Sequence, residues 1–384
     1  MRILALTDSL ADTDGVGRYC IRLLGGIEKL RSNISIEIAL ARKHPGLSDA
    51  VPKSWRVKLC LPPDYYYYVS TARFYAYTAW ALSQLIPAAR RADVVHAIKD
   101  FPHCYLAHLA ARAAGKPCVM TAHGTYAVLP LADPRHSARA RNCYPQFKKI
   151  LCVSEYTKKR ITEKIQVNNL EVIKNAVDAS HYAPRPRLAG MPWSGARYTA
   201  GMGALKERKG HHLAIAGFLK IANAFPELKH FVVGMYQKGD PYFEAIREKI
   251  RNAGCEERVV FLGNIKENEK VDLLLGAEAL VHTPVIAADG GFEGFGIVYL
   301  EAAASGVPSI GTKASGAEDA VVEGVTGYLV DINEDAVAAA LSRILSDRPL
   351  RERLRNSCIA YAKEQTWEKN ARRVLSIYDE ILND

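Results

Sequence analysis

Two glutamates, Glu293 and Glu301, are separated by seven residues around the predicted start of a short helix. Residues 297–305 have the composition expected of that helix. A glycine-rich turn at a helix N-terminus attracts an anion, because backbone N–H groups and the helix dipole both favour negative charge there. The segment therefore predicts a phosphate site formed by the backbone of Gly294, Phe295, Gly296 and Ile297.

The two carboxylates fit different parts of a ligand that carries such a phosphate. Glu301 lies about one turn inside the helix, where it can accept hydrogen bonds from a ribose diol. Glu293 is still in the loop and is placed to reach a sugar on the other side of the phosphate. The alternative is an ordinary α/β unit whose glutamates are solvated first-turn residues, since Glu is favoured in a first turn anyway.

The whole string Glu293-Gly-Phe-Gly-Ile-Val-Tyr-Leu-Glu301 resembles the E-x7-E signature of retaining glycosyltransferases of the GT-B fold, specifically glycosyltransferase family 4. The resemblance continues through Gly316 and Glu318 to Gly327. It implies a retaining, metal-independent hexosyltransferase that moves a sugar from a nucleotide diphosphate to an acceptor hydroxyl, in the synthesis of a cell-envelope glycan, glycolipid or polysaccharide. The alternatives are a phosphorylase or sucrose-synthase-like enzyme on the same fold, or a nucleotide-sugar-binding protein without catalysis.

Predicted strands and helices alternate in both halves of the chain, which is typical of parallel sheets covered by helices. We expect strands near residues 2–7, 35–40, 55–59, 93–97, 117–122, 150–153 and 170–173, and a second series near 197–202, 230–234, 259–263, 279–283, 308–311 and 327–330. A polar, proline-rich linker is expected over 179–195. The fold class is α/β, with two Rossmann-like doubly wound domains, 1–180 and 181–365, facing each other across a cleft. By resemblance, the former is the acceptor-side domain and the latter binds the nucleotide sugar, while the last helix, 366–384, crosses back to the first domain.

The segment Asp14-Gly15-Val16-Gly17-Arg18 follows the first predicted strand and opens a helix, so its backbone can approach a ligand closely. A dinucleotide-binding turn is the competing interpretation. That turn needs a third glycine, where this chain has Cys20, and an acidic residue after the second strand, where it has Arg42. In the resembled family the loop meets the donor phosphate or the acceptor, which implies roles for Gly15 and Gly17.

Further segments match the family one by one. His123 ends a predicted strand beside Gly124 and is expected to contact the donor sugar. Gly203-Ala-Leu-Lys-Glu-Arg-Lys209-Gly resembles a loop in which an arginine and a lysine flank the leaving diphosphate. Lys209 fits the lysine, but Ala204 occupies the arginine position, so we expect Arg208 or Arg18 to supply the second charge. Asn264 and Ile265 resemble the loop whose backbone lines the nucleobase pocket.

The resemblance implies a mechanism without a metal or resident cofactor, with the nucleotide sugar as substrate. Lys209 and the helix terminus would stabilise the leaving diphosphate, Glu293 would orient the sugar hydroxyls, and Glu301 would hold the ribose. His123 joins Glu293 and Lys209 in the expected catalytic set. The nucleotide base and the sugar stay open, with GDP-mannose and a UDP-hexose as the leading candidates.

Charge is distributed unevenly along the 384 residues. Residues 1–180 carry 26 Lys and Arg against 14 Asp and Glu, a net charge of +12, whereas residues 181–384 carry 25 against 27, a net of −2. We expect the first half to face something anionic, either a membrane surface or a phosphorylated acceptor. Nucleic acid is disfavoured as a partner, since the basic residues are dispersed and no recognisable nucleic-acid module is present. A glycan or lipid-linked molecule is the expected acceptor.

The expected location is the cytoplasm. Peripheral attachment to the inner face of the plasma membrane is a further expectation. The first residues have the pattern of a buried strand rather than a secretion signal, and no apolar run reaches ~18 residues. The eight cysteines are scattered singly, which favours reduced thiols. Aromatic and apolar residues are concentrated in a helix expected near residues 66–88, which either packs on the sheet or rests on a bilayer interface.

Overall fold

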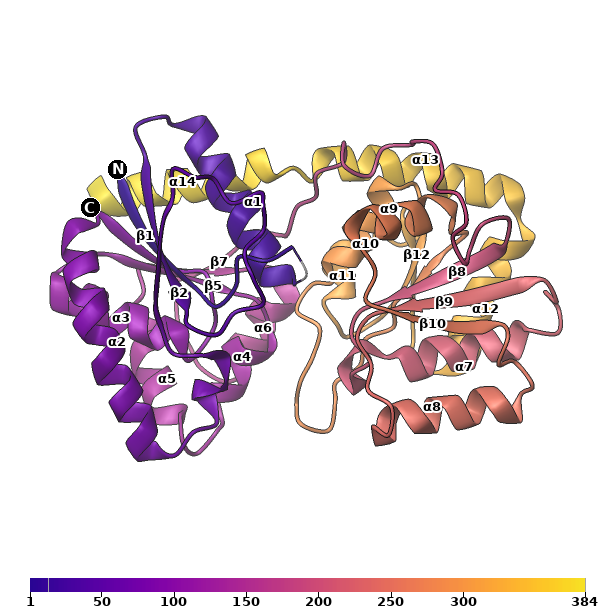
Figure 1. The fold of residues 1–384 in the computed structure, drawn as a ribbon, viewed down its shortest axis with the longest axis horizontal. Coiled ribbons are helices and arrows are strands. Elements are labelled where there is room, and N and C mark those ends of the chain that lie inside the picture. Colours follow the sequence, from indigo (N-terminus) through magenta and orange to yellow (C-terminus); the bar gives the residue numbers. More distant parts are fainter. Residues whose placement is uncertain (13, 384) are drawn as a thin grey trace. The chain divides into compact units, whose positions relative to one another are not determined.

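The computed structural model describes residues 1–12 and 14–383. The chain divides into two compact units. Unit 1 contains Met1–Asn175 together with the C-terminal segment that begins at Trp367, and unit 2 contains Ala176–Thr366. Each unit is built around a parallel sheet with helices on its faces (Figure 1).

Unit 1 contains a seven-stranded parallel sheet in the order β3-β2-β1-β4-β5-β6-β7 among the residues described. The central strands are almost entirely apolar and buried, as expected where both faces of a parallel sheet are covered by helices. Every strand expected from the sequence of this half is confirmed to within two residues at either end. The strands are β1 Arg2–Thr7, β2 Ser35–Ala41, β3 Arg56–Leu61, β4 Val94–Ala97, β5 Cys118–Ala122, β6 Lys149–Cys152 and β7 Leu170–Val172.

The helices of unit 1 connect these strands in the right order for a doubly wound sheet. They are α1 Gly15–Leu30, α2 Thr71–Arg91, α3 His103–Ala114, α4 Thr125–Val128, α5 Ser137–Cys143 and α6 Glu155–Thr162. The aromatic helix expected near 66–88 starts later, because residues Asp64–Tyr67 form a separate 3₁₀ turn and Ser70 is the N-cap of α2. The consecutive tyrosines therefore point in different directions: Tyr66 and Tyr67 are buried, whereas Tyr65 and Tyr68 are exposed.

The last helix, α14 (Trp367–Asn383), packs beside α1 in unit 1 (Figure 1). The two helices approach closely where Gly26 of α1 meets Ala371. Arg31 donates two hydrogen bonds to Asp379, at 2.8 and 2.6 Å. Deeper in the unit, the hydroxyl of Tyr378 bonds to Nδ1 of His96 on β4 at 2.5 Å. The last helix is thus part of the core of unit 1 although the whole of unit 2 separates it from α1 in the sequence.

Unit 2 contains a six-stranded parallel sheet in the order β10-β9-β8-β11-β12-β13 within the described part of the chain. Its strands are β8 Arg197–Met202, β9 Leu228–Val233, β10 Val259–Gly263, β11 Leu280–Val281, β12 Ser309–Thr312 and β13 Gly327–Val330. The sequence predicted all six, but β11 is shorter than expected because the chain leaves the sheet at His282. Because β11 ends at Val281, the residues that follow it lie next to the loop after β8.

Helices cover both faces of the second sheet. They are α7 His211–Ile221, α8 Pro241–Asn252, α9 Glu267–Gly276, α10 Ile297–Ala304, α11 Ala317–Ala320, α12 Glu334–Ser346 and α13 Arg348–Glu364. Phe218, Val232 and Leu341 belong to one buried cluster that joins α7 and α12 to the sheet. The expected helix after the first glutamate is confirmed as α10, one residue shorter than predicted because Ser305 is its C-cap.

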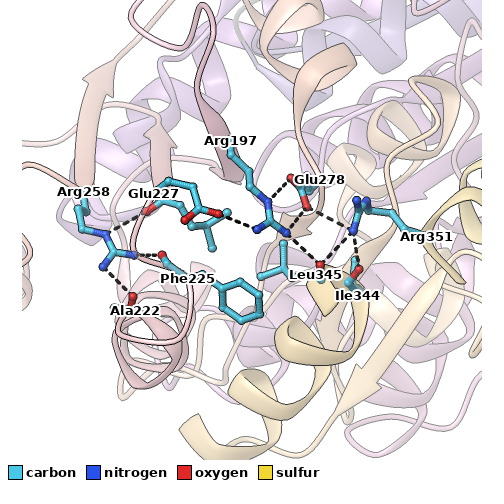
Figure 2. A network of polar contacts seen from close by, with 10 residues as sticks. Arg197, Ala222, Phe225, Glu227, Arg258, Glu278, Ile344, Leu345 and Arg351 are labelled. Atoms are coloured by element: carbon cyan, nitrogen blue, oxygen red, sulfur yellow. Dashed lines mark hydrogen bonds and ion pairs between the residues drawn. The ribbon is translucent and has the colours of Figure 1, made fainter. Parts of the chain in front are cut away.

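Arginines hold the edge of this sheet at which the strands begin (Figure 2). Arg197, the first residue of β8, donates hydrogen bonds to Glu278 at 2.7 Å and to Glu227 at 2.9 Å. Arg258, just before β10, donates hydrogen bonds to two backbone carbonyls of the α7 to β9 connection and to the carbonyl of Leu228, the first residue of β9. The network ties loops to strand starts, so it stabilises the edge opposite to the one where ligands bind in sheets of this kind.

The linker expected over residues 179–195 is packed as part of unit 2. Its side chains are hydrogen-bonded to the buried carboxylate of Asp272. Arg187 donates to both oxygens of Asp272, at 2.8 and 3.1 Å, and Trp193 donates its indole N–H at 2.7 Å. The sequence pattern identified the polar and proline-rich composition of this segment correctly but not its packing, since the partner residue lies about 80 positions away.

Candidate active site

Three segments meet at the carboxyl edge of the unit 2 sheet. They are the loop 203–210 after β8, residues 282–284 after β11, and residues 293–296 before α10. Two glycines allow the segments to touch. A Cβ on Gly210, whose φ is +71°, would lie 1.6 Å from the carbonyl oxygen of Thr283. A Cβ on Gly316 would lie 2.4 Å from the backbone of Gly294. These close backbone contacts fix the positions of the loops that carry the side chains described next.

Glu293 is the electrostatic centre of this edge. The carboxylate is 9% exposed and its Oε2 forms an ion pair with Nζ of Lys209. Arg208 reaches the same oxygen with Nη1 at 3.5 Å, and Nε2 of His282 lies 3.6 Å away. Burial alone would raise the pKa of Glu293, but Lys209, His282 and Arg208 outweigh it and hold this pKa well below its usual range. The carboxylate is ionised in the presence of three basic groups.

The cations expected from the loop after β8 are thus placed together. Lys209 and Arg208 are neighbours in sequence, yet both contact Glu293, because residues Glu207–Lys209 form a tight 3₁₀ turn rather than an extended strand. Arg208 also lies against the loop before α10, with its Cδ 3.4 Å from the Cβ position of Gly291. Ala204, which stands where an arginine was expected, precedes that turn, and its carbonyl oxygen accepts a hydrogen bond from the N–H of Lys206 at 2.7 Å.

The turn before α10 has the geometry predicted for an anion site. Gly296 is the N-cap with a φ of +83°, and among the described residues no side chain caps the helix. The ring of Tyr299 lies under Gly296 and its hydroxyl donates to the carbonyl oxygen of His282 at 2.5 Å. Residues 293–296 are therefore an irregular segment that leads directly into Ile297, the first residue of α10.

Glu301 lies one turn further along α10 and is 2% exposed. Its Oε1 accepts a hydrogen bond from Nζ of Lys270, on α9, at 3.1 Å. Lys270 also pairs with Glu267 at 2.9 Å. The expected separation of the two glutamates is found: Glu293 belongs to the cluster with Lys209, and Glu301 belongs to a different cluster with Lys270. Asn264 and Ile265 follow β10 and lead directly into α9, the helix that carries Lys270.

The remaining expected residues lie in unit 1. Asp14 is the N-cap of α1 and accepts a hydrogen bond from the backbone N–H of Gly17 at 2.7 Å. A Cβ on Gly17 would lie 2.4 Å from the carbonyl oxygen of Ala11, so this position requires glycine. Gly15, by contrast, has open space around its Cβ position. Arg18 lies in the first turn of the same helix and is half-buried.

His123 follows β5 at the carboxyl edge of the unit 1 sheet. Its Nε2 donates to the carbonyl oxygen of Ile98 at 3.1 Å, and its backbone N–H donates to Asp100 at 2.8 Å. Burial, with Lys99 nearby, lowers the pKa of His123 to about 4. Burial raises the pKa of Asp100 to about 6. His123 is therefore a neutral imidazole whose Nδ1 is the accepting nitrogen, which suits a hydroxyl ligand rather than acid catalysis.

Sequence reasoning missed two residues of the unit 2 edge, His282 and Lys270. His282 follows a strand so short that only its position after the apolar pair Leu280–Val281 hinted at an edge location. Lys270 had a weaker signal, its spacing of three from Glu267 on a helix. Lys99, paired with Asp8 at 2.5 Å in unit 1, was likewise not anticipated.

Comparisons with known families match nearly the whole chain. The family described as Glycosyl transferases group 1 matches residues 194–365, and the family described as Glycosyltransferase Family 4 matches residues 13–181. Among solved structures, Anabaena HepE in complex with UDP and glucose superposes with a TM-score of 0.76 at 19% identity, covering 98% of both chains. A similarity at this identity establishes the fold, which is GT-B.

Curated relatives share more of the sequence. The chain is 29% identical over 260 residues to the GDP-mannose-dependent alpha-(1-6)-phosphatidylinositol monomannoside mannosyltransferase of Mycolicibacterium smegmatis, a match that covers 64% of this chain and 65% of that enzyme. It is 28% identical over 377 residues to the phosphatidyl-myo-inositol mannosyltransferase of the same organism, covering 96% and 90%. It is also 25% identical to the N-acetyl-alpha-D-glucosaminyl L-malate synthase of Bacillus anthracis, covering 96% of each.

Proposed function

We propose a substrate class for this chain from one premise: it belongs to glycosyltransferase family 4, and it is a retaining glycosyltransferase that uses a nucleotide-sugar donor. The proposal is that it moves a hexose, mannose from GDP-mannose in the first place and a UDP-linked hexose in the second, onto a hydroxyl of a lipid-linked or glycan acceptor. One observation carries it, the convergence of Lys209 and Arg208 on Glu293 beside the N-terminus of α10.

A diphosphate fits that convergence better than Glu293 does. Each of the two cations has a single carboxylate oxygen as its ion-pair partner among the described residues, and both cations come from one turn. A diphosphate offers several oxygens to both cations, and the N-terminus of α10 adds the positive end of its dipole. Arg208 would thus supply the guanidinium that Ala204 does not. The sequence-based roles of His123, Gly15, Gly17 and Arg18 stay predictions.

The course of the transfer is the one that a retaining enzyme of this family implies. The oxygen of the acceptor hydroxyl forms a bond to the anomeric carbon on the face from which the phosphate departs, and the bond from that carbon to the phosphate oxygen breaks. The proton of the hydroxyl passes to the leaving phosphate oxygen. Negative charge grows on the diphosphate along this path, so Lys209 and Arg208 contribute more in the transition state than in the ground state.

The different environments of the two glutamates give a first prediction. Glu301→Gln is expected to weaken binding of the bare nucleoside diphosphate at least tenfold, because the ribose diol loses a charged acceptor, ~1.4 kcal/mol. Glu293→Gln is expected to leave that binding unchanged or tighter, since it removes the anion that occupies Lys209 and Arg208, and to lower turnover of the full sugar nucleotide. Calorimetric titration with GDP and UDP measures the first effect. Equal losses of affinity in both variants would contradict the assignment.

The donor is tested most directly by ligand-induced stabilisation. A ligand that binds only the folded protein raises the melting temperature, so GDP-mannose, UDP-glucose, GDP and UDP are compared at equal concentration. Release of nucleoside diphosphate from the stabilising sugar nucleotide then measures turnover. Stabilisation without release, under every acceptor tried, would indicate a binding protein that has lost catalysis. The absence of any stabilisation would contradict the proposed donor class.

The acceptor proposal rests on the relatives and on exposed aromatic residues of unit 1. Two of the relatives carry phosphatidylinositol lipids in their names. On unit 1, Tyr68 and Tyr75 are 59% and 53% exposed. Arg139 stacks over the ring of Tyr75 at 4.9 Å and donates to its hydroxyl. Aromatic rings beside arginines are the composition expected at a bilayer interface with anionic lipid. Among the described residues, no helix meets the length and hydropathy needed to span a bilayer.

We therefore expect this protein to float with anionic vesicles more than with neutral ones. The attraction should fade as salt rises past ~0.15 M, where the screening length is about 8 Å. The double variant Tyr68→Ser with Tyr75→Ser is expected to reduce recovery. Met235→Ser, which removes an exposed apolar side chain from unit 2, is the matched control. Equal recovery with both lipid types would instead indicate an acceptor in solution.

A further inference from the structure

His282 is a fully buried imidazole at the candidate active site. Its backbone is held on both sides: its N–H donates to the carbonyl oxygen of Ile310 at 3.0 Å, and its own carbonyl oxygen accepts the hydroxyl of Tyr299 at 2.5 Å. The ring of Tyr299 meets the imidazole edge-on, with ring centroids 5.2 Å apart. The ring of His282 is thus fixed in place by contacts that do not involve its nitrogens.

Neither ring nitrogen of His282 has a hydrogen-bond partner among the described residues. A buried polar group without a partner is destabilising, so each such group in a native protein calls for an explanation. A leucine would fill the same space without that cost. The nearest charged atom gives a direction: Nε2 lies 3.6 Å from Oε2 of Glu293, just beyond hydrogen-bond distance. The imidazole therefore lies against Glu293 at slightly more than a normal hydrogen-bond distance, and this contact already helps to lower the pKa of that carboxyl.

Binding of a diphosphate changes the ion-pair partners of Glu293. In the free protein, Glu293 is neutralised by Lys209 and Arg208. A diphosphate carries more charge than one carboxylate and draws both cations toward itself. Glu293 is then a buried carboxylate that has lost its strongest partners, and such a group tends to take up a proton. A protonated Glu293 could no longer accept hydrogen bonds with both oxygens from the sugar.

We propose that His282 is a positioning residue for this reaction: when the donor diphosphate engages Lys209 and Arg208, Nε2–H of His282 bonds to Glu293 and keeps it ionised and turned toward the sugar. The inference rests on the proposed function. Because the backbone of residues 282–284 is locked against Gly210, closing the small gap needs movement of the Glu293 side chain only.

The charged and titratable groups that face Glu293 and His282 are few. Lys209 and Arg208 come from the loop after β8, and the hydroxyl of Tyr299 comes from α10. His211, on α7, faces the ring of His282, but its Nε2 donates to the carbonyl oxygen of Gly203 at 2.9 Å. Burial lowers the pKa of His282, so the imidazole is neutral and has one N–H to donate.

The test compares His282→Leu with His282→Gln. Glutamine places an amide N–H near the position of Nε2, whereas leucine keeps only the volume. Both variants are expected to bind GDP or UDP within about twofold of wild type, because the diphosphate contacts are intact. Turnover of the sugar nucleotide should fall at least tenfold in His282→Leu. In His282→Gln it should stay within about threefold of the wild-type rate.

The pH profile separates positioning from packing. Glu293 must be ionised to act, so activity is lost as the pH falls through its pKa in the donor complex. Loss of the His282 bond raises that pKa, and the acid limb of kcat, which reports the donor complex, therefore moves to higher pH in His282→Leu only. His230→Leu is the control. His230, on β9, is equally buried, and its Nδ1 bonds to Thr199 at 2.9 Å. It has no electrostatic influence on Glu293, so its loss should lower stability without moving the acid limb.

Each outcome decides something. An active wild type whose acid limb is unchanged in His282→Leu overturns the role of His282 and leaves the proposed function standing. A wild type that neither binds nor turns over GDP-mannose or UDP-glucose overturns both. If His282→Leu does not fold, His282→Gln is compared with His282→Asn, whose shorter amide cannot reach Glu293. Identical pH profiles in that pair contradict the proposal.

Discussion

Lys209→Met is expected to lower kcat/KM for the sugar nucleotide by about 10²-fold to 10³-fold, or ~2.7 to 4 kcal/mol of transition-state stabilisation. The reason is burial. The side chain of Lys209 is 18% exposed and its ammonium faces Glu293 within the locked turn, so its charge is little screened by water. Methionine keeps most of the aliphatic stem and removes only the charge. Initial rates of nucleoside diphosphate release measure the change.

Two comparisons make this prediction specific. Lys206→Met changes the same residue type in the same loop, but Lys206 is exposed, so its rate should stay close to wild type. The kcat/KM of Arg208→Met should lie between those of the two lysine variants, at least tenfold below wild type, a loss of about 1.4 kcal/mol. The guanidinium of Arg208 is more exposed than Lys209 and stands farther from Glu293. Rates near wild type for Lys209→Met would exclude the loop as the diphosphate clamp.

Gly210→Ala is expected to destabilise unit 2 by about 3 kcal/mol or more and to abolish most activity. Two costs add. An alanine at a φ of +71° is strained, and its Cβ would collide with the carbonyl of Thr283, so the loop or the strand end must move. Movement of the loop displaces Lys209, the preceding residue, and movement of the strand end displaces His282, the residue before Thr283. Differential scanning calorimetry measures the loss of stability, and the release assay measures the loss of activity.

Gly239→Ala provides the matched control. Its φ is +83°, so alanine carries a similar backbone strain there, but nothing lies within 4 Å of its Cβ position. We expect a loss of only about 1 kcal/mol and an unchanged rate. The difference between the two variants isolates the contact between the loop and the strand end. Equal effects would mean that backbone strain, and not this contact, accounts for the requirement for glycine.

Local patterns predicted the strands well because each buried parallel strand is a short apolar run bounded by turn residues. Helix starts were harder. The aromatic segment looked continuous from residue 66, and only the tertiary environment decides that Tyr66 turns inward to bond with Thr78 while Ser70 begins the helix. The linker gives the same lesson, since its attachment depends on Asp272, which no local pattern connects with Arg187.

The candidate site shows the same division between local and distant information. Glu293, Glu301 and Lys209 were found because each belongs to a contiguous motif. That Arg208 stands beside Lys209 against one carboxylate follows from the tight turn over Glu207–Lys209, which sequence spacing alone did not indicate. His282 could not be found in this way. Its proposed role depends on Glu293, eleven residues away, and on two ring nitrogens without hydrogen-bond partners, and neither feature is visible in a local motif.

The return of α14 to unit 1 has a consequence for the order in which the chain matures. A ribosome synthesises all of unit 2 between α1 and the helix that packs beside it, so the two partners of the contact at Gly26 and Ala371 are made far apart in time. Unit 2 is one uninterrupted segment and has every residue of its own core as soon as Thr366 emerges. Unit 1 lacks Tyr378, the partner of His96, until the whole of unit 2 has been synthesised. The unit that is started first is therefore the unit that is finished last.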